Sequence, residues 1–328
     1  MSEGGLTILD GTQLRAVDLS LPPVEGSGVI TGVEVLELAE SRASLALHGL
    51  ALPVSIKSAA FQRLGVSDGA AFRTTELDYE KAQSILQTYV SAISNELKDN
   101  PIVVAILDGR TLRIFLEDED DFAMLAENIF TDLDAEDRGK ISKNEIKNAL
   151  IRMGLEMGIP PLSEFPQLSD ILKRHGAEEK EELGQAQFAQ LLQSVLQELA
   201  DALAKKHIVM VQNIKIVNGS KLRKLLADEN QLDGVLKKIL LEKNDHKNEE
   251  RITTTIRLCL EKSGKDLGLP PSKIDETETL FDEVFTEIES KKIDAESKKD
   301  EFMVLLKEIL EKFAEKLEAN PVLYDAVD

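Results

Sequence analysis

The chain has 328 residues, of which 42% are apolar, and it carries a formal net charge of −21 at neutral pH. This length is enough for two or three domains with separate hydrophobic cores, and the apolar content argues against wholesale disorder. The acidic excess argues against nucleic acids and anionic membrane surfaces as partners, since both require a basic face, and it is compatible with a bound cation or a basic partner.

The first residues show no targeting signal, and they contain a stretch that recurs later in the chain. Met1–Gly11 lacks the basic segment and apolar run of a signal peptide, and Ser2 does not fit the N-myristoylation motif, which needs glycine. The sequence contains no run of 18 uncharged apolar residues, so we predict no membrane span. The stretch ILDGTQLR (Ile8–Arg15) returns later in modified form. Pro22–Gly28 stands where the second unit has a predicted helix, so we expect one helix of the first unit to be absent or truncated.

A predicted amphipathic helix occurs three times along the chain. Its copies cover Ala82–Leu97, Phe188–Leu203 and Phe302–Leu317, with apolar residues at offsets 0, 3, 4, 7, 8, 11 and 15 in each copy. This spacing places one apolar stripe along a helix of 3.6 residues per turn. Because many unrelated helices share such a stripe, the evidence for duplication comes from the segments that flank these copies.

Recurring start segments divide the chain into three units. ILDGRTLR (Ile106–Arg113) and IVNGSKLR (Ile216–Arg223) repeat the first marker, and each precedes a Pro-Pro turn by the same distance. A fixed internal period of this kind indicates duplication of a supersecondary unit. We therefore predict an all-α fold of three tandem helix-loop-helix pairs, which cover residues 1–104, 105–214 and 215–328.

The window Asp121–Leu155 of the second unit predicts a helix, a twelve-residue loop and a second helix, and it resembles the EF-hand, which implies the loop positions that follow. Gly139 falls at loop position six, where a sharp turn favours a residue that tolerates positive φ. Ile141 falls at position eight, and we expect it to form a short strand contact with Leu183 of the later loop. Glu145 falls at position twelve, where both carboxylate oxygens can bind an ion.

This register predicts at most one competent calcium site in the chain. The predicted ligands are two carboxylates at the start of the loop, one backbone carbonyl, one hydroxyl that holds a water and one bidentate carboxylate: Asp134, Glu136, Lys140, Ser142 and Glu145. Position five is Arg138, whose guanidinium cannot coordinate a cation and repels one at short range. Two interpretations follow: a calcium site with Arg138 turned to solvent, or a loop kept only for the packing of its helices.

The remaining loops of the first two units lack more of the expected ligands. Glu25–Glu34 retains a glycine at position six and Glu34 at position twelve, but Pro23 stands at position one. The later loop of the first unit has Lys81 at position twelve, and a lysine there is incompatible with a calcium site. In the second unit, Gln187 replaces the terminal glutamate of the later loop.

The loops of the third unit are also degenerate. Asn244–Ile256 has the length of a calcium loop but ends without a glutamate. The later loop has Glu301 at position twelve, with Ser290 and Lys292 at positions one and three. The third unit also contains the only cysteine, Cys259, on the apolar face of a predicted helix, so we expect a buried structural thiol. Without an intrachain disulfide, we expect the protein in the cytoplasm or the nucleus.

Three segments, two in the second unit and one across its boundary with the first, carry a resemblance to a known family. They are ILDG (Ile106–Gly109), EDEDDF (Glu117–Phe122) and NPIVVAILD (Asn100–Asp108). With the loop described above, the chain resembles the calmodulin-like EF-hand superfamily, and most of all plant EF-hand proteins with paired, partly degenerate loops. The resemblance covers nearly all of the second unit and more loosely the other two. It implies helix-pair folding, calcium binding and protein partners.

The sequence offers little that predicts an enzyme. The four histidines, His48, His175, His207 and His246, are far apart, and no nucleophile elbow, phosphate loop or C-x-x-C motif is present. We therefore expect a non-enzymatic protein. It is either a calcium-binding sensor or adaptor that exposes an apolar surface to an amphipathic or basic partner helix, or a calcium-independent helical scaffold that binds partners through fixed grooves.

Overall fold

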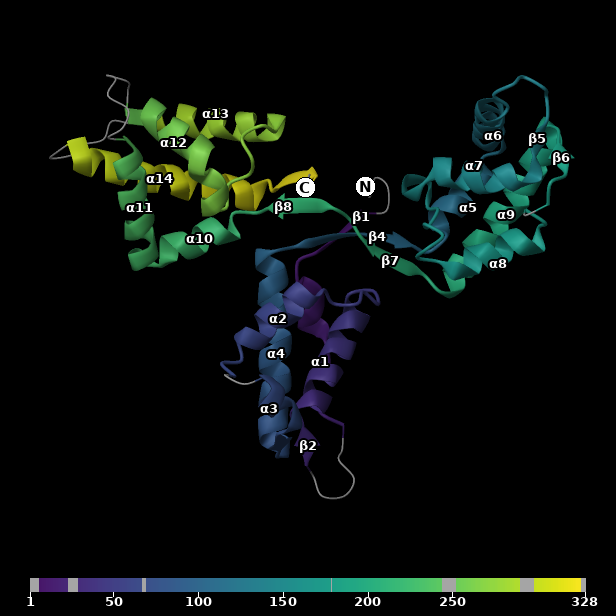
Figure 1. Cartoon of the computed structure of the whole chain (residues 1–328). Helices are drawn as coiled ribbons and strands as arrows, with labels where there is room; N and C mark the ends of the chain where they lie inside the picture. Colours follow the sequence, from purple (N-terminus) through teal and green to yellow (C-terminus); the bar gives the residue numbers. More distant parts are fainter. Residues whose placement is uncertain are drawn as a thin grey trace.

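The computed structural model describes residues 6–22, 29–66, 69–177, 179–243, 252–289 and 298–325. Within these ranges the chain is mostly helical, with fourteen α-helices and a few short strands. The helices form three lobes that meet at short strands in the middle of the molecule (Figure 1). Each lobe has its own hydrophobic core, and the buried residues of the three cores fall within residues 9–104, 105–203 and 222–322.

The first unit is built on helix α4, whose predicted apolar stripe faces the core and includes the fully buried Leu86, Ile93 and Leu97. A short 3-10 helix stands in place of the first helix of the second unit, and residues 17–22 form no helix. Of Pro22–Gly28, where a helix was expected to be absent or truncated, residues 23–28 lie outside the described residues. The elements of this lobe are η2 (Thr12–Ala16), β2 (Ile30–Thr31), α1 (Gly32–Ala46), α2 (Val54–Gln62), α3 (Gly69–Thr74), β3 (Glu76–Leu77) and α4 (Tyr79–Asp99).

The second and third units contain their α-helices in the same order. Helices α10 and α11 begin 110 residues after α5 and α6 and have the same lengths. The second unit contains α5 (Arg110–Glu117), α6 (Glu119–Leu133), β5 (Ile141–Ser142), η3 (Lys143–Glu145), α7 (Ile146–Met153), η4 (Leu155–Met157), α8 (Pro166–Arg174), β6 (Glu182–Leu183) and α9 (Gln185–Lys205). The third contains α10 (Ser220–Ala227), α11 (Glu229–Lys243), α12 (Ile252–Leu267), α13 (Asp275–Glu289) and α14 (Lys298–Ala319).

One glycine in each start segment packs against the long last helix of its unit. A Cβ atom on Gly109 would lie 2.3 Å from the carbonyl oxygen of Ala200 in α9, and Gly109 has φ +79°. The equivalent glycines, Gly11 and Gly219, approach Ser94 of α4 and Ala314 of α14 in the same way. The three contacted residues lie at the same offset in the repeated helix, so all three units share this contact.

Strands at the unit boundaries join the lobes. The antiparallel strands β1 (Leu6–Leu9), β4 (Ile102–Leu107) and β7 (Ile208–Val211) form a sheet with β4 in the centre. Because side chains alternate along a strand, Val104 of β4 enters the first core while its neighbour Ala105 enters the second. The third unit is closed separately by β8 (Ile214–Val217) and β9 (Val322–Asp325), which are also antiparallel.

These boundary strands make the all-α prediction incomplete. The segments after each long helix are repeat markers in the sequence, and the prediction assigned them no secondary structure. Their β-branched runs, IVVAIL in β4 and IKIV in β8, carry the strand signal. The structure is therefore helical in most of its described residues, with a three-stranded sheet between the first two units.

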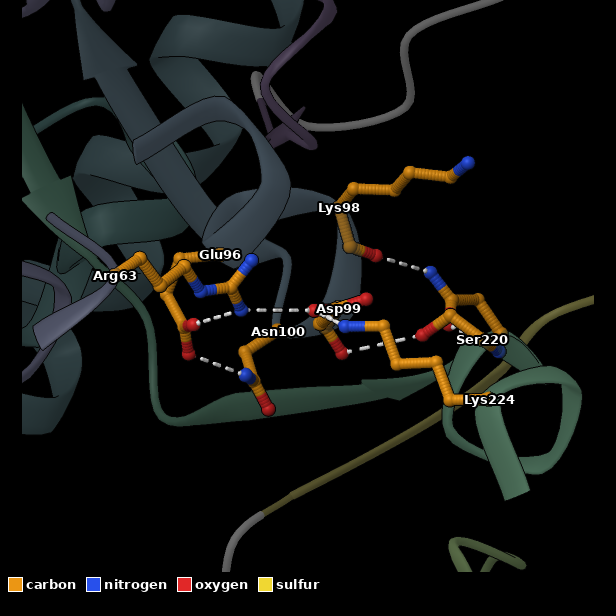
Figure 2. Close-up of polar contacts among 8 residues, drawn as sticks. Arg63, Glu96, Lys98, Asp99, Asn100, Ser220 and Lys224 are labelled. Atoms are coloured by element: carbon orange, nitrogen blue, oxygen red, sulfur yellow. Dashed lines mark hydrogen bonds and ion pairs between the residues drawn. The ribbon is translucent and has the colours of Figure 1, made fainter. Parts of the chain in front are cut away.

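The third unit docks onto the C-terminal end of α4 in the first unit. The Asp99 carboxylate, of which 9% is exposed, pairs with Arg63 at 3.2 Å and with Lys224 of α10 (Figure 2). Ser220 lies close to the backbone carbonyl of Asp99, and the Asn218 amide donates to the carbonyl of Lys98 at 3.0 Å. Both groups of the third unit thereby satisfy carbonyls that the end of a helix leaves without intrahelical partners.

Among the helices in the described ranges, none combines the length and the apolar character needed to cross a membrane.

Candidate functional site

The loop between α6 and α7 is organised by Asp134, the residue that follows α6. Its two carboxylate oxygens accept hydrogen bonds from the backbone N–H groups of Arg138, at 3.0 Å, and Gly139, at 2.6 Å. Gly139 has φ +68° with no atom near the position of a Cβ, so the backbone conformation, rather than lack of space, favours glycine there. The loop therefore has the compact turn that the sequence predicted.

The two loops of the second unit are held together by a short strand contact. Strands β5 and β6 are antiparallel, and Ile141 pairs with Leu183, which confirms this part of the prediction. Both side chains are buried in the second core. The Lys143 N–H extends the contact by donating to the carbonyl of Glu181 at 2.8 Å. The first unit has an equivalent contact between Ile30 and Leu77.

Arg138 forms ion pairs with acidic residues of both loops. Its Nε lies 3.2 Å from Oε2 of Glu136, and its Nη1 lies 3.6 Å from Oε1 of Glu182. Glu136 is one of the predicted calcium ligands, so a guanidinium neutralises a carboxylate that the ion would need. Arg138 remains more than half exposed, and each of these pairs is individually weak in water.

A second basic residue bridges the same two loops. The Lys143 ammonium lies 3.1 Å from Glu179 and 3.5 Å from Glu181. The hydrogen bond to Glu179 is the main cause of an increase in the pKa of Lys143, which keeps the ammonium charged. Lys143 and its partners are not among the residues predicted from the sequence. The available signal was the acidic run GAEEKEEL facing a loop with basic residues at positions five, seven and ten.

The predicted ligand at position twelve is engaged by a residue that follows it in the next helix. The Glu145 carboxylate accepts a hydrogen bond from the Asn148 side chain at 2.6 Å. Lys140 is exposed and Ser142 is half-buried in β5. In the part of the chain that the structure describes, no group of three or more histidine, cysteine, aspartate or glutamate side chains is arranged to hold a metal ion. In this arrangement Glu136 pairs with Arg138, Glu145 accepts from Asn148, and Asp134 accepts from backbone N–H groups of its own loop.

In two other loops, the residue at position twelve caps the start of a helix. In the first unit, Glu34 accepts hydrogen bonds from the N–H and hydroxyl of Thr31, both at 2.7 Å, and so completes a capping box at the start of α1. In the second unit, Gln187 accepts from the Gly184 N–H at 3.1 Å at the start of α9, which is one half of such a box because Gly184 has no side chain. Pro23 and most of the predicted loops of the third unit lie outside the described residues.

The remaining candidate residues are separate from this loop. Cys259 is buried in the third core, as expected. His175 contacts Glu198 on α9 at 2.8 Å, and His207 contacts the backbone carbonyl of His48 at 2.8 Å. These histidines serve contacts within or between units and form no shared cluster.

Comparison of the chain with protein-family models, with curated proteins and with solved structures found no match.

Proposed function

We propose that this protein is a calcium-independent, non-enzymatic interaction module built from degenerate EF-hand pairs. The observation that carries the proposal is the position of Arg138 between Glu136 and Glu182, in the one loop whose sequence retains most calcium ligands. A cation that belongs to the chain itself then substitutes for the charge that calcium would supply. Lys143 adds a second permanent positive charge between the same two loops.

The other described loops support the same proposal. Glu34 and Gln187 stand at ligand position twelve and use their side-chain oxygens to cap helices. A capping interaction needs no ion, and it fixes the start of the helix at any calcium concentration. The helix pairs would therefore keep one arrangement and bind partners through fixed surfaces. The net charge of −21 favours a basic amphipathic helix as the partner.

Calcium binding at Asp134–Glu145 is the second candidate function. The compact turn held by Asp134 and the β5–β6 contact favour it, because both belong to the backbone arrangement that paired calcium loops use. Binding would require Arg138 to leave Glu136 and Glu145 to leave Asn148. The two candidates differ in one property that can be measured, the affinity of the wild-type chain for calcium.

Calcium titration by calorimetry tests the proposal. We expect no heat of binding for the wild-type chain at millimolar calcium, and a measurable affinity for Arg138→Asp. This substitution removes a repelling charge and adds an oxygen ligand. Every 1.4 kcal/mol gained in binding free energy lowers Kd about tenfold. Adding Glu145→Gln to Arg138→Asp should abolish that binding, since it removes a ligand oxygen.

Two outcomes would contradict this account. Binding to the wild-type chain, lost in Glu145→Gln, would establish the calcium-sensor function instead. Absence of binding in Arg138→Asp would show that the loop register is wrong. As a test of the partner, a synthetic basic amphipathic peptide should bind the wild-type chain equally well in calcium and in EGTA. A peptide affinity that rises when calcium is added would refute calcium independence.

A further inference from the structure

A cavity of about 420 Å³ lies at the junction of the first and third units. Its walls come from the N-terminal end of α2, the C-terminal end of α4, the start of β4, the end of β7, strand β8, the start of α10 and the end of α12. The contacts of Asn218, Ser220 and Lys224 with α4 hold these walls together (Figure 2). This volume falls within the range of small-molecule sites.

The charge around the cavity is opposite to that of the whole chain. Lysines of the third unit line it, and one of them also lines an adjacent groove over α10, α11 and α12. Together the two hollows are lined by five lysines and two aspartates: Lys215, Lys221, Lys224, Lys238, Lys265, Asp99 and Asp266. The chain as a whole has 39 basic and 60 acidic residues, so this is a local basic region in an acidic protein.

The acidic side chain that lines the cavity has ion-pair partners, whereas the lysines that line it have none among the described residues. The one carboxylate that lines it, Asp99, is largely buried and already paired with Arg63 and Lys224. By contrast, Lys215, Lys221 and Lys265 form no ion pair with any residue in the ranges that the structure describes. Three ammonium groups with no ion-pair partner among the described residues therefore border one hollow.

Other donors face the same hollow. Gly219 caps α10 without a side chain. The Ser220 N–H donates to the Asn218 side chain, and the N–H of Lys221, in the first turn, lacks an intrahelical partner. The start of a helix adds a partial positive charge to that of the lysines. Tyr324 of β9, which pairs with Lys215 of β8, also lines the cavity and offers a phenolic donor.

We propose that this junction cavity binds a small anion that carries at least two acidic groups, phosphate or carboxylate. One acidic group would lie at the start of α10 beside Lys221, and the other would pair with Lys215 or Lys265. A single exposed ion pair contributes little, but convergent charge-assisted hydrogen bonds in a partly enclosed site are stronger. Because the walls include residues of both the first and the third unit, the bound anion would also stabilise the docking of the third unit on the first.

Isothermal titration of the full chain with inorganic pyrophosphate, in EDTA at low salt, tests this proposal. We expect saturable binding at one site per chain. The variant Lys215→Ala, Lys221→Ala, Lys265→Ala should bind at least about tenfold more weakly, because each lost charge-assisted bond is worth roughly that factor. A parallel titration with citrate distinguishes the two chemistries: tighter pyrophosphate binding identifies a phosphate site, and tighter citrate binding identifies a carboxylate site.

The matched control removes the same charge elsewhere. Lys147, Lys173 and Lys262 do not line the cavity, so their triple alanine variant should bind pyrophosphate within about twofold of the wild type. If the site triple variant loses its helical circular dichroism, the single variant Lys265→Gln replaces it, with weaker binding still expected. Failure of both anions to bind the wild-type chain, or equal weakening by the control, would overturn the proposal whatever the calcium titration gives.

Discussion

At the scale of single residues, the repeated glycine at the start of each unit has the strictest requirement. Gly109 has positive φ, and its α-carbon faces the backbone of Ala200 in α9 without room for a methyl group. The contact brings the start of the unit against its last helix. The sequence contains this glycine in all three markers, but only the packing explains why the position needs it.

Replacing Gly109 with alanine should therefore lower stability by roughly 2–5 kcal/mol. This sum combines the cost of a left-handed backbone for alanine with the overpacking against Ala200. Urea unfolding followed by circular dichroism measures the change. Gly65 is the matched control, because it also has positive φ but a methyl group added there would have no atom within 4 Å. Gly65→Ala should cost only about 1–2 kcal/mol. Equal losses in the two variants would contradict the packing explanation.

Arg138 illustrates a residue whose effect depends on a distant partner. Its position five in the loop is visible in the sequence, and so is its conflict with calcium binding. Its pairing with Glu182 is not visible, because that residue lies 44 positions later and reaches the loop only through the β5–β6 contact. The tertiary structure thus adds a reason for Arg138 to remain in the loop rather than to turn away from it.

At the scale of the elements, the start of α1 is capped by a side chain that stands at position twelve of a predicted loop. Thr31 and Glu34 form a reciprocal cap on α1, and these hydrogen bonds lower the pKa of Glu34. A carboxyl group with a lowered pKa in the folded state stabilises the fold above the pKa of the unfolded chain. That contribution is lost as the pH falls through the folded-state pKa.

Glu34→Ala should consequently lower the melting temperature at pH 7, and the difference from the wild type should shrink when the pH is well below the ordinary glutamate pKa of about 4.3. Thermal unfolding at pH 7 and at pH 3 tests both statements. Glu37→Ala, on the same helix and exposed to solvent, should leave the melting temperature nearly unchanged. A difference for Glu34→Ala that persists undiminished at low pH would exclude the ionised carboxylate as its cause.

At the scale of the whole molecule, the third unit docks onto the first unit through Asn218. The equivalent residues of the other start segments are aspartates, Asp10 and Asp108, which accept hydrogen bonds from residues two positions later. Asn218 accepts from Ser220 in the same way, but its amide also donates to the Lys98 carbonyl of α4. An aspartate could not make the second bond, because an ionised carboxylate has no donor.

Asn218→Asp should therefore keep the local turn and loosen the docking of the third unit. It removes the bond to Lys98 and places a negative charge at the C-terminal end of a helix, where the macrodipole disfavours it. Small-angle X-ray scattering should show an increased radius of gyration. The reverse exchange in the second unit, Asp108→Asn, should not change it, since Asp108 bonds within its own start segment. An unchanged scattering curve for Asn218→Asp would show that this bond does not hold the units together.

The long helices, the three start segments and the compact Asp134 loop could be predicted from the amino-acid sequence alone. Each of these depends on residues close together in the chain: an apolar stripe over α4 or α9, or a glycine at a fixed offset. The pairing of Ile141 with Leu183 was also predicted, from the resemblance of both loops to a paired type that meets at position eight.

How the units are joined depends on contacts that appear only in the folded chain. The short apolar runs of β4 and β8 are ambiguous in isolation, since strands are stabilised by partners that lie far along the chain. The same is true of the bond between Asn218 and Lys98 and of the lysines around the junction cavity. Lys215, Lys221 and Lys265 have no common spacing in the sequence, and they converge because β8, α10 and α12 meet at one place against the first unit.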